Sequence, residues 1–167
     1  MTRHTGRTVI VTGAASGIGA ATAALLAAEG ATVAAFDRSA VTVDGGRGWA
    51  VDLADPDAVT AAVAAATGVL GPPDAVVNCA GVSVPTPIDG DSFWDAWSAT
   101  LAVNLEAYVR VIRAALPAPT ASPAGRIVNV ASTEGLGPRR TSRRTRSAST
   151  GSSDSPGPSP ANSVRAA

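Results

Sequence analysis

The chain has 167 residues, 46% of them apolar and only 4% aromatic, so Ala, Val, Leu and Ile must build the core of a single expected domain. No run of about 18 uninterrupted apolar residues occurs, which argues against a membrane-spanning helix, and the N-terminus lacks the apolar stretch of a secretory signal. One cysteine, Cys79, excludes an internal disulfide, so the sequence favours a cytoplasmic protein that does not associate with membranes.

The formal net charge of zero conceals a difference between two parts of the chain. Residues 1–138 carry seven Arg against twelve Asp and Glu, whereas residues 139–167 carry six Arg against one Asp. Ser, Pro, Gly and like charges dominate the second part and apolar side chains are few. We therefore expect a folded domain over residues 1–138 and a disordered Arg/Ser/Pro-rich tail over residues 139–167.

Five short apolar runs, rich in β-branched residues, predict buried strands. In chain order they are Thr8–Gly13, Ala31–Asp37, Gly48–Leu53, Asp74–Gly81 and Gly125–Ser132. Helix formers fill the intervals at residues 17–30, which end on a glycine stop, and at residues 91–116. Between them, Asp55 as N-cap, Pro56 at the first helical position and Gly68 as stop predict a further helix.

Strands that alternate with helices predict parallel pairing, right-handed crossovers and helices on both faces of the sheet. The expected fold is therefore α/β, a Rossmann-type doubly wound parallel sheet that is incomplete on its C-terminal side. Such sheets bind ligands beyond the carboxyl ends of their strands. The sequence places Gly13, Asp37, Asp52, Asn78 and Ser132 at those ends.

The segment TGAASGIG places Gly13, Gly17 and Gly19 between the first strand and the first helix. Glycines allow a tight turn and close backbone approach, and the helix N-terminus offers free N–H groups to a phosphate; the alternative is a turn that only packs. Asp37, which ends the second strand, can accept both ribose hydroxyls of an adenosine and would repel a 2′-phosphate. NAD is therefore expected rather than NADP, although the neighbouring Arg38 could hold a phosphate.

These residues and their order resemble the short-chain dehydrogenases/reductases over residues 7 to about 138. TGAASGIG resembles the family's cofactor turn, VDL the acid that contacts adenine, and NCAG its Asn-Asn-Ala-Gly motif. VNLEA resembles the helix that carries the family's asparagine, and IVNVAS the strand that delivers its serine. The resemblance implies that the cofactor is bound by Gly13, Ser16, Gly17, Ile18, Gly19, Asp37, Asp52, Leu53, Asn78, Ala80 and Gly81.

The resemblance also implies an NAD(P)-dependent oxidoreductase that acts on a small-molecule alcohol or ketone. Ser132 would hydrogen-bond the reacting oxygen, and Asn104 would help to hold a water near the catalytic lysine. Ser132 could instead only turn the chain, Asn104 could bond only to backbone, and Asn78 is expected to be structural in either case. Trp94 and Trp97, at helical spacing, are expected to pack, and Cys79 is given no role.

The family's Tyr-x-x-x-Lys pair is missing. The chain contains no lysine, and its single tyrosine, Tyr108, lies upstream of Ser132, where a packing role is expected. The expected positions hold Thr145 and Ser149, which cannot replace a phenol whose pKa a neighbouring cation lowers. We therefore expect this chain to be inactive, and a nucleotide-binding protein without catalysis is the alternative.

The composition of the tail suggests why the pair is missing. Thr, Ser, Arg, Ala, Gly and Pro are nearly all encoded with C or G in the middle position, as in a GC-rich gene read out of frame. In a frame that starts one nucleotide earlier, Thr145 falls in a codon set that includes Tyr, and Ser149 in one that includes Lys. The hypothesis is a frameshift after about Pro138 to Arg140.

Loss of the family's sequence beyond residue 138 has structural consequences. The fifth strand should become an exposed apolar edge, which invites aggregation, and one face of the sheet should lose its cover. Homo-oligomers are usual in the family but doubtful here. The Arg-rich segment RRTSRRTR lacks interleaved aromatic residues and acidic residues dominate the rest of the chain, so no nucleic-acid partner is expected.

Overall fold

The computed structural model describes residues 2–123 and 125–132, and it divides the chain into Met1–Ala131 and Ser132–Ala167. Within the first unit, all strands are parallel and form one sheet in the order β3-β2-β1-β4-β5. The strands are β1 Thr8–Thr12, β2 Thr32–Asp37, β3 Gly46–Ala50, β4 Ala75–Asn78 and β5 Arg126–Asn129. The predicted doubly wound parallel sheet is confirmed, whereas the predicted tail, residues 139–167, lies outside the described residues.

The third strand begins two residues earlier than predicted and ends three residues earlier. Its register is set by β2, with Gly46 opposite Val33 and Ala50 opposite Asp37, so pairing ends where β2 ends. The predicted strand extended to Leu53 because Val51 and Leu53 are apolar. Both are buried, but they lie in the turn beyond the strand. Asp52 consequently lies in a turn and not in a strand.

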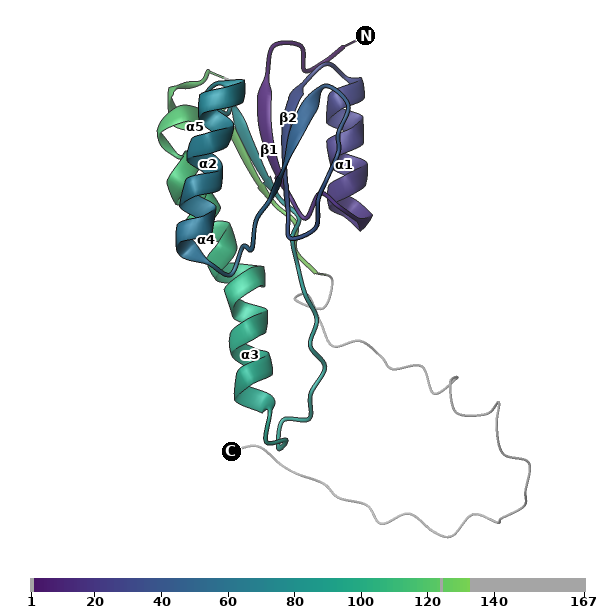
Figure 1. The fold of residues 1–167 in the computed structure, drawn as a ribbon, viewed down its shortest axis with the longest axis vertical. Helices are drawn as coiled ribbons and strands as arrows, with labels where there is room; N and C mark the ends of the chain where they lie inside the picture. The colour runs from purple at the N-terminus through teal and green to yellow at the C-terminus, as the bar shows by residue number, and fades with distance from the viewer. Residues whose placement is uncertain (1, 124, 133–167) are drawn as a thin grey trace, which may run out of the picture. The chain divides into compact units, whose positions relative to one another are not determined.

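Helices cover both faces of the sheet, but unequally (Figure 1). Helix α1, Gly17–Ala28, packs on one face against Val9, Val11 and Val33. Helices α2, Pro56–Leu70, and α4, Ala107–Ala115, lie side by side on the other face. Their buried side chains, among them Val59, Val63 and Val111, surround Ile10, Phe36 and Val76 of the sheet.

The remaining helical segments are α3, Phe93–Leu101, the π-helical turn η1, Ala102–Glu106, and α5, Pro117–Ala121. One helix end and one additional helix differ from the prediction. Helix α2 continues through Gly68 to Leu70, because the left-handed residue that ends it is Gly71, with φ +85°. Helix α5 was not expected, although its first residue is the proline predicted to end the preceding helix.

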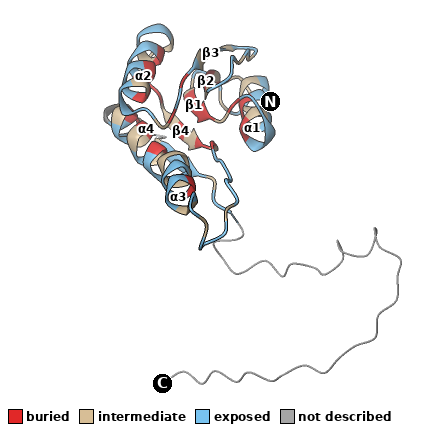
Figure 2. Cartoon of the chain, turned by 60° about the horizontal axis from the view of Figure 1, so that its bottom comes forward, coloured by how far each residue is buried: buried red, intermediate tan, exposed pale blue. Residues whose placement is uncertain are grey.

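The strand β5 is the exposed edge that the sequence predicts. All four of its residues are exposed, and Ile127 and Val128, which point to opposite faces, are 42% and 48% accessible. Neither face of the sheet is therefore fully covered at this edge. The central strands β1 and β2 are, in contrast, largely buried (Figure 2). In the part of the chain that the structure describes, no helix has the length and apolar character to span a bilayer.

A polar network ties the strands together at their N-terminal ends. The Asp74 carboxylate accepts hydrogen bonds from the Ser122 hydroxyl at 2.6 Å, the Thr8 N–H at 3.1 Å and the Arg7 guanidinium at 2.9 Å. The Ser122 hydrogen bond, with the Thr8 and Arg7 donors, holds the pKa of Asp74 below its ordinary value, and partial burial opposes them. The network links β1, the start of β4 and the segment after α5.

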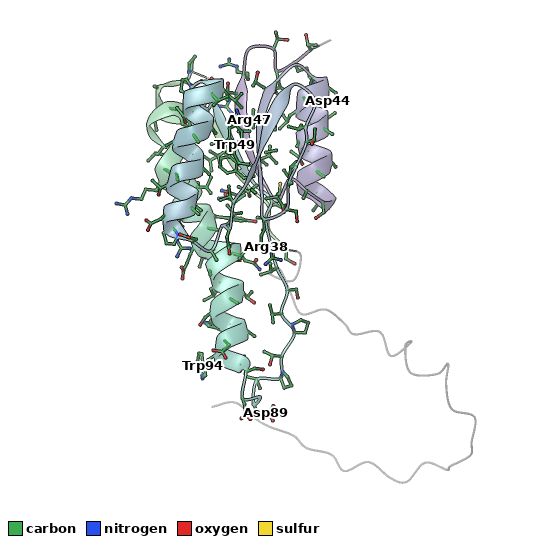
Figure 3. The ribbon with its side chains drawn as sticks, in the orientation of Figure 1. Arg38, Asp44, Arg47, Trp49, Asp89 and Trp94 are labelled. Atoms are coloured by element: carbon green, nitrogen blue, oxygen red, sulfur yellow. The ribbon has the colours of Figure 1, made fainter. Side chains whose placement is uncertain are left out.

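We expect Asp74→Ala to lower the free energy of unfolding by about 1–2 kcal/mol at neutral pH, because it leaves the Thr8 N–H and Arg7 without their acceptor. Since the folded-state pKa is lowered, the difference from the wild type should be full above the ordinary pKa of 3.8 and should shrink as the pH falls through the lowered value. Urea unfolding at several pH values measures it. Asp44→Ala, an exposed carboxylate without a hydrogen bond among the described residues (Figure 3), is the control; equal losses in both variants would contradict the role of Asp74.

The exposed edge leads to a second expectation, about self-association. Val128→Lys should reduce the apparent mass of the chain at high concentration, because a charged side chain on an edge strand opposes strand pairing between molecules. Val69→Lys is the matched control, since Val69 is exposed to a similar extent, 54%, but lies on α2. Light scattering after gel filtration measures both. The same decrease in both variants would show that β5 is not the associating surface.

Candidate functional site

A cavity of about 420 Å³ opens at the carboxyl ends of the central strands. Its wall is formed by the turn after β1, the first turn of α1, the end of β2 with the loop that follows, the turn after β3, the loop after β4 and one residue of η1. The lining residues are Gly13, Ser16, Gly17, Ile18, Gly19, Asp37, Arg38, Ser39, Val51, Asp52, Leu53, Cys79, Ala80, Gly81, Val82 and Val103. The structure thus brings together every residue predicted to bind the cofactor except Asn78.

The glycine turn lies directly against the end of β4. Gly13 has φ +68°, and a Cβ built on it would lie 2.8 Å from the Cα of Ala80. The Thr12 hydroxyl accepts the N–H groups of Cys79 and Ala80, both at 3.1 Å. A Cβ on Gly19 would lie 2.1 Å from the carbonyl oxygen of Gly13, so α1 also needs glycine to approach the turn.

The N-terminus of α1 forms part of the same cavity and has no side-chain cap. Ser16 occupies the N-cap position without a side-chain hydrogen bond, and the first turn contains no acidic residue. Helix α2 shows the contrast, because Asp55 accepts the N–H groups of Asp57 and Ala58 at 2.8 and 3.1 Å. The free N–H groups of α1 and its dipole therefore suit an external anion such as a phosphate.

The carboxylate of Asp37 holds the neighbouring backbone in place. One oxygen accepts the Ala15 N–H at 3.0 Å and the other accepts the Ser39 N–H at 2.9 Å. Each carboxylate oxygen has a second lone pair, so hydroxyl groups in the cavity could still donate to it. Arg38 also lines the cavity and lies at this end of the sheet (Figure 3).

Asn104 holds the loop that follows β4. Its side-chain oxygen accepts the Val82 N–H at 2.8 Å, and its side-chain nitrogen donates to the Val82 carbonyl at 2.9 Å. The residue lies within the π-helical turn η1, a widened turn of a kind that often occurs at functional sites. Because Gly81, Val82 and Val103 line the cavity, this clamp shapes its wall.

Asn78 and Tyr108 make structural hydrogen bonds. Asn78 is fully buried and donates to Asn129 at 2.9 Å, across β4 and β5; its side-chain oxygen has no partner in the described part of the chain. The single hydrogen of the Tyr108 hydroxyl is shared between two carbonyl oxygens, that of Ala80 at 2.8 Å and that of Val130 at 3.2 Å. Tyr108 therefore does more than pack.

Burial, together with the nearby Cys79, raises the pKa of the Tyr108 hydroxyl above its ordinary value. A phenol that donates to backbone carbonyls, and whose pKa is raised, is poorly suited to accept a proton near neutral pH. Burial likewise raises the pKa of the Cys79 thiol, against a weaker effect of the Thr22 hydrogen bond. Neither side chain is set up as a base.

The sequence profile of the short chain dehydrogenase family matches residues 7–143. The chain belongs to this family. It is 40% identical over 141 residues to a D-threitol dehydrogenase from Mycolicibacterium smegmatis, an alignment that covers 78% of this chain and 54% of that protein. The chain thus spans about half the length of the curated relatives that it matches.

Solved structures of this short-chain dehydrogenase family share the fold. A short-chain dehydrogenase/reductase from Serratia marcescens superposes with a TM-score of 0.71 and 33% identity, over 78% of this chain and 60% of its own. A ligand-free aldohexose dehydrogenase from Thermoplasma acidophilum gives a TM-score of 0.72 and 29% identity, over 78% and 51%. The predicted resemblance to the family is confirmed.

Three positions at which the resemblance predicts reaction residues fall in the second unit. Ser132 follows β5, is exposed and belongs to the second unit. Thr145 and Ser149, at the expected positions of the catalytic pair, lie outside the described residues. Among residues 2–123 and 125–132, no group of three His, Cys, Asp or Glu side chains could hold a metal ion.

Some residues that line the cavity were not predicted as site residues. Cys79 was given no role although it faces the cavity, and Val51, Val82 and Val103 were missed. Their positions beside Asp52, Gly81 and Asn104 were the available signal. Trp94 and Trp97, expected to pack, do contact Phe93, with ring centroids at 5.2 and 6.0 Å, but remain 71% and 50% exposed.

We expect Gly13→Ala to lower the free energy of unfolding by about 3 kcal/mol or more, because it adds both a disfavoured positive φ and a backbone clash. Gly6→Ala is the matched control, since Gly6 has φ +74° but open space around its Cβ, and it should cost about 1–2 kcal/mol. Chemical denaturation measures the two values. Equal values would mean that the approach to Ala80 is not a tight constraint.

Proposed function

We propose that residues 1–138 form the dinucleotide-binding domain of a short-chain dehydrogenase and that the cavity at the carboxyl ends of the strands takes NAD. The observation that carries this proposal is the uncapped N-terminus of α1, which forms part of a cavity whose wall also contains Asp37. The diphosphate of the cofactor would accept N–H groups from Gly17, Ile18 and Gly19. Bound NAD would supply the hydride acceptor.

The adenosine half of the cofactor suits the side of the cavity formed by β2 and the turn after β3. Asp37 would accept the ribose hydroxyls, and Asp52 and Leu53 would contact the adenine. The opposite side, formed by Ala80 and Gly81, would accommodate the nicotinamide end. Asn78 acts there through the support it gives to β4, because it is buried and does not line the cavity.

The charge of Asp37 favours NAD over NADP. Both of its oxygens already hold backbone N–H groups, so the carboxylate is fixed close to where a 2′-phosphate would lie. Two negative groups held this close repel each other. Arg38 offers the only guanidinium among the residues that line this cavity and would reduce the penalty, so the expected preference is moderate.

The reaction proposed for the family site is hydride transfer between the nicotinamide and an alcohol or carbonyl carbon of a small molecule. Ser132 would donate a hydrogen bond to the reacting oxygen, and Asn104 would keep the wall of the cavity in shape through its clamp on Val82. D-Threitol and aldohexoses, named for two similar proteins, are polyhydroxylated compounds that contain such groups. The proposed substrate class is accordingly an alcohol or its carbonyl product.

We further propose that this chain transfers hydride slowly or not at all. The sequence contains no lysine, so no lysine ammonium group can lower the pKa of a phenol. The hydroxyl of Tyr108 is committed to the carbonyls of Ala80 and Val130. The function supported best for the chain as it stands is therefore nucleotide binding without efficient catalysis, on a fold that serves an oxidoreductase.

The proposed frameshift is tested by the coding DNA around codon 138. A shift of one nucleotide should restore Tyr and Lys codons at positions 145 and 149. If no shifted frame contains both, the hypothesis is wrong, and the missing pair needs another cause. The cytoplasmic location, the absence of a nucleic-acid partner and the doubtful homo-oligomer stay predictions.

Titration calorimetry should detect binding of NAD, weaker binding of NADP, and no alcohol-dependent NADH formation above about a tenth of the ordinary enzymatic turnover of about 10 s⁻¹. Asp37→Ala should reduce the ratio of NAD to NADP affinity several-fold, whereas the control Asp44→Ala should leave it unchanged. Turnover at ordinary rates would overturn the proposed inactivity. An unchanged affinity ratio in Asp37→Ala would overturn the placement of the ribose.

A further inference from the structure

We propose that Arg110 is a positioning residue for the adenine side of the cavity: by donating to the Ala54 carbonyl, its guanidinium holds the turn that carries Asp52 and Leu53. This inference rests on the proposed binding of a dinucleotide. It concerns a side chain of α4 that does not line the cavity itself. Arg110 would therefore act on the ligand only through the backbone of the turn.

The hydrogen bond is well formed and partly sheltered. Nη1 of Arg110 donates to the carbonyl oxygen of Ala54 at 2.9 Å, across 56 residues of sequence. Its Nη2 forms an ion pair with Glu106, one turn earlier on the helix, and the Arg110 side chain is only 26% exposed. The ion pair with Glu106 orients the guanidinium, so that less conformational freedom is lost when the other nitrogen meets Ala54.

The peptide groups around Ala54 are fixed from both sides. The Ala54 N–H donates to the carboxylate of Asp52 at 2.9 Å, while its carbonyl accepts from Arg110. The Asp55 N–H donates to the Asp52 carbonyl at 3.1 Å, and the Val51 N–H donates to the carbonyl of Asp37 at 2.8 Å. The turn is thus hydrogen-bonded to β2 at its start, leads into the N-cap of α2 at its end, and is hydrogen-bonded to α4 through Arg110 in between.

This attachment matters because no strand pairing holds the turn after β3. Strand β3 ends at Ala50, and α2 begins at Pro56. Asp52 is exposed, whereas Val51 and Leu53 are 5% and 6% exposed and anchor the turn by their apolar side chains. The buried side chains of Val51 and Leu53 hold the turn against the core, and Arg110 fixes the orientation of the Ala54 carbonyl.

Helix α4 supplies a matched control for this role. Arg113 lies on the same helix, three residues further on, is exposed, and has no hydrogen bond or ion pair among the described residues. Arg113→Met therefore removes the same charge and the same donors without releasing the turn. Comparing it with Arg110→Met separates the positioning effect from the general effect of a lost guanidinium on α4.

The binding experiment uses the full chain and two probes, ADP-ribose, which contains the adenosine half, and nicotinamide mononucleotide, which lacks it. Arg110→Met should weaken ADP-ribose binding about three- to tenfold and leave nicotinamide mononucleotide unchanged, whereas Arg113→Met should change neither. Glu106→Gln keeps the donor to Ala54 and should cause a smaller loss. Equal ADP-ribose affinities in the two arginine variants, or equal losses for both probes in Arg110→Met, would overturn the inference.

A second measurement does not need a ligand. Amide hydrogen exchange over residues 51–58 should be faster in Arg110→Met than in Arg113→Met, and Arg110→Lys should restore part of the protection. If wild type binds neither probe, the proposed function is wrong, and exchange alone then decides whether Arg110 holds the turn. Unchanged exchange in Arg110→Met would overturn its positioning role, whatever the binding result.

Discussion

The close approach of the turn after β1 to the end of β4 is the constraint on which the rest of the structure depends. At Gly13 there is no room for a Cβ beside Ala80, and the hydroxyl of Thr12 accepts the two N–H groups that β4 presents there. This contact brings the glycine turn and NCAG to one edge of the sheet. Without it, the N-terminus of α1 and the β4 loop would not share a cavity.

Most polar side chains around the cavity hold backbone in place. Asp37 accepts from the turn after β1, and Asn104 clamps the loop after β4 through both atoms of its amide. Tyr108 donates to the carbonyls at the ends of β4 and β5, and Arg110 to the turn after β3. A preorganised cradle of this kind suits the binding of an extended ligand, since little order remains to be imposed when the ligand arrives.

The same arrangement supports the proposal that this chain binds a nucleotide without efficient reaction. The groups that would hold a dinucleotide come from the first four strands and their turns, all of which lie in Met1–Ala131. The proposed lack of turnover rests on the chain's single tyrosine, Tyr108, whose phenol has a raised pKa and a structural role. In addition, because β5 is exposed, this part of the sheet buries less apolar surface than a fully covered sheet, and burial therefore stabilises it less.

The sequence by itself determined the order of the elements, the parallel sheet, the glycine turn and most of the residues around the cavity, because periodicity, glycine spacing and strand ends are local properties. It also determined that no lysine is available. Only the tertiary structure decided where β3 ends, since its length depends on pairing with β2, and which valines complete the cavity wall. Likewise, the roles of Asn104, Tyr108 and Arg110 follow from carbonyls and N–H groups that lie 22 to 56 residues away in the chain, which no local pattern encodes.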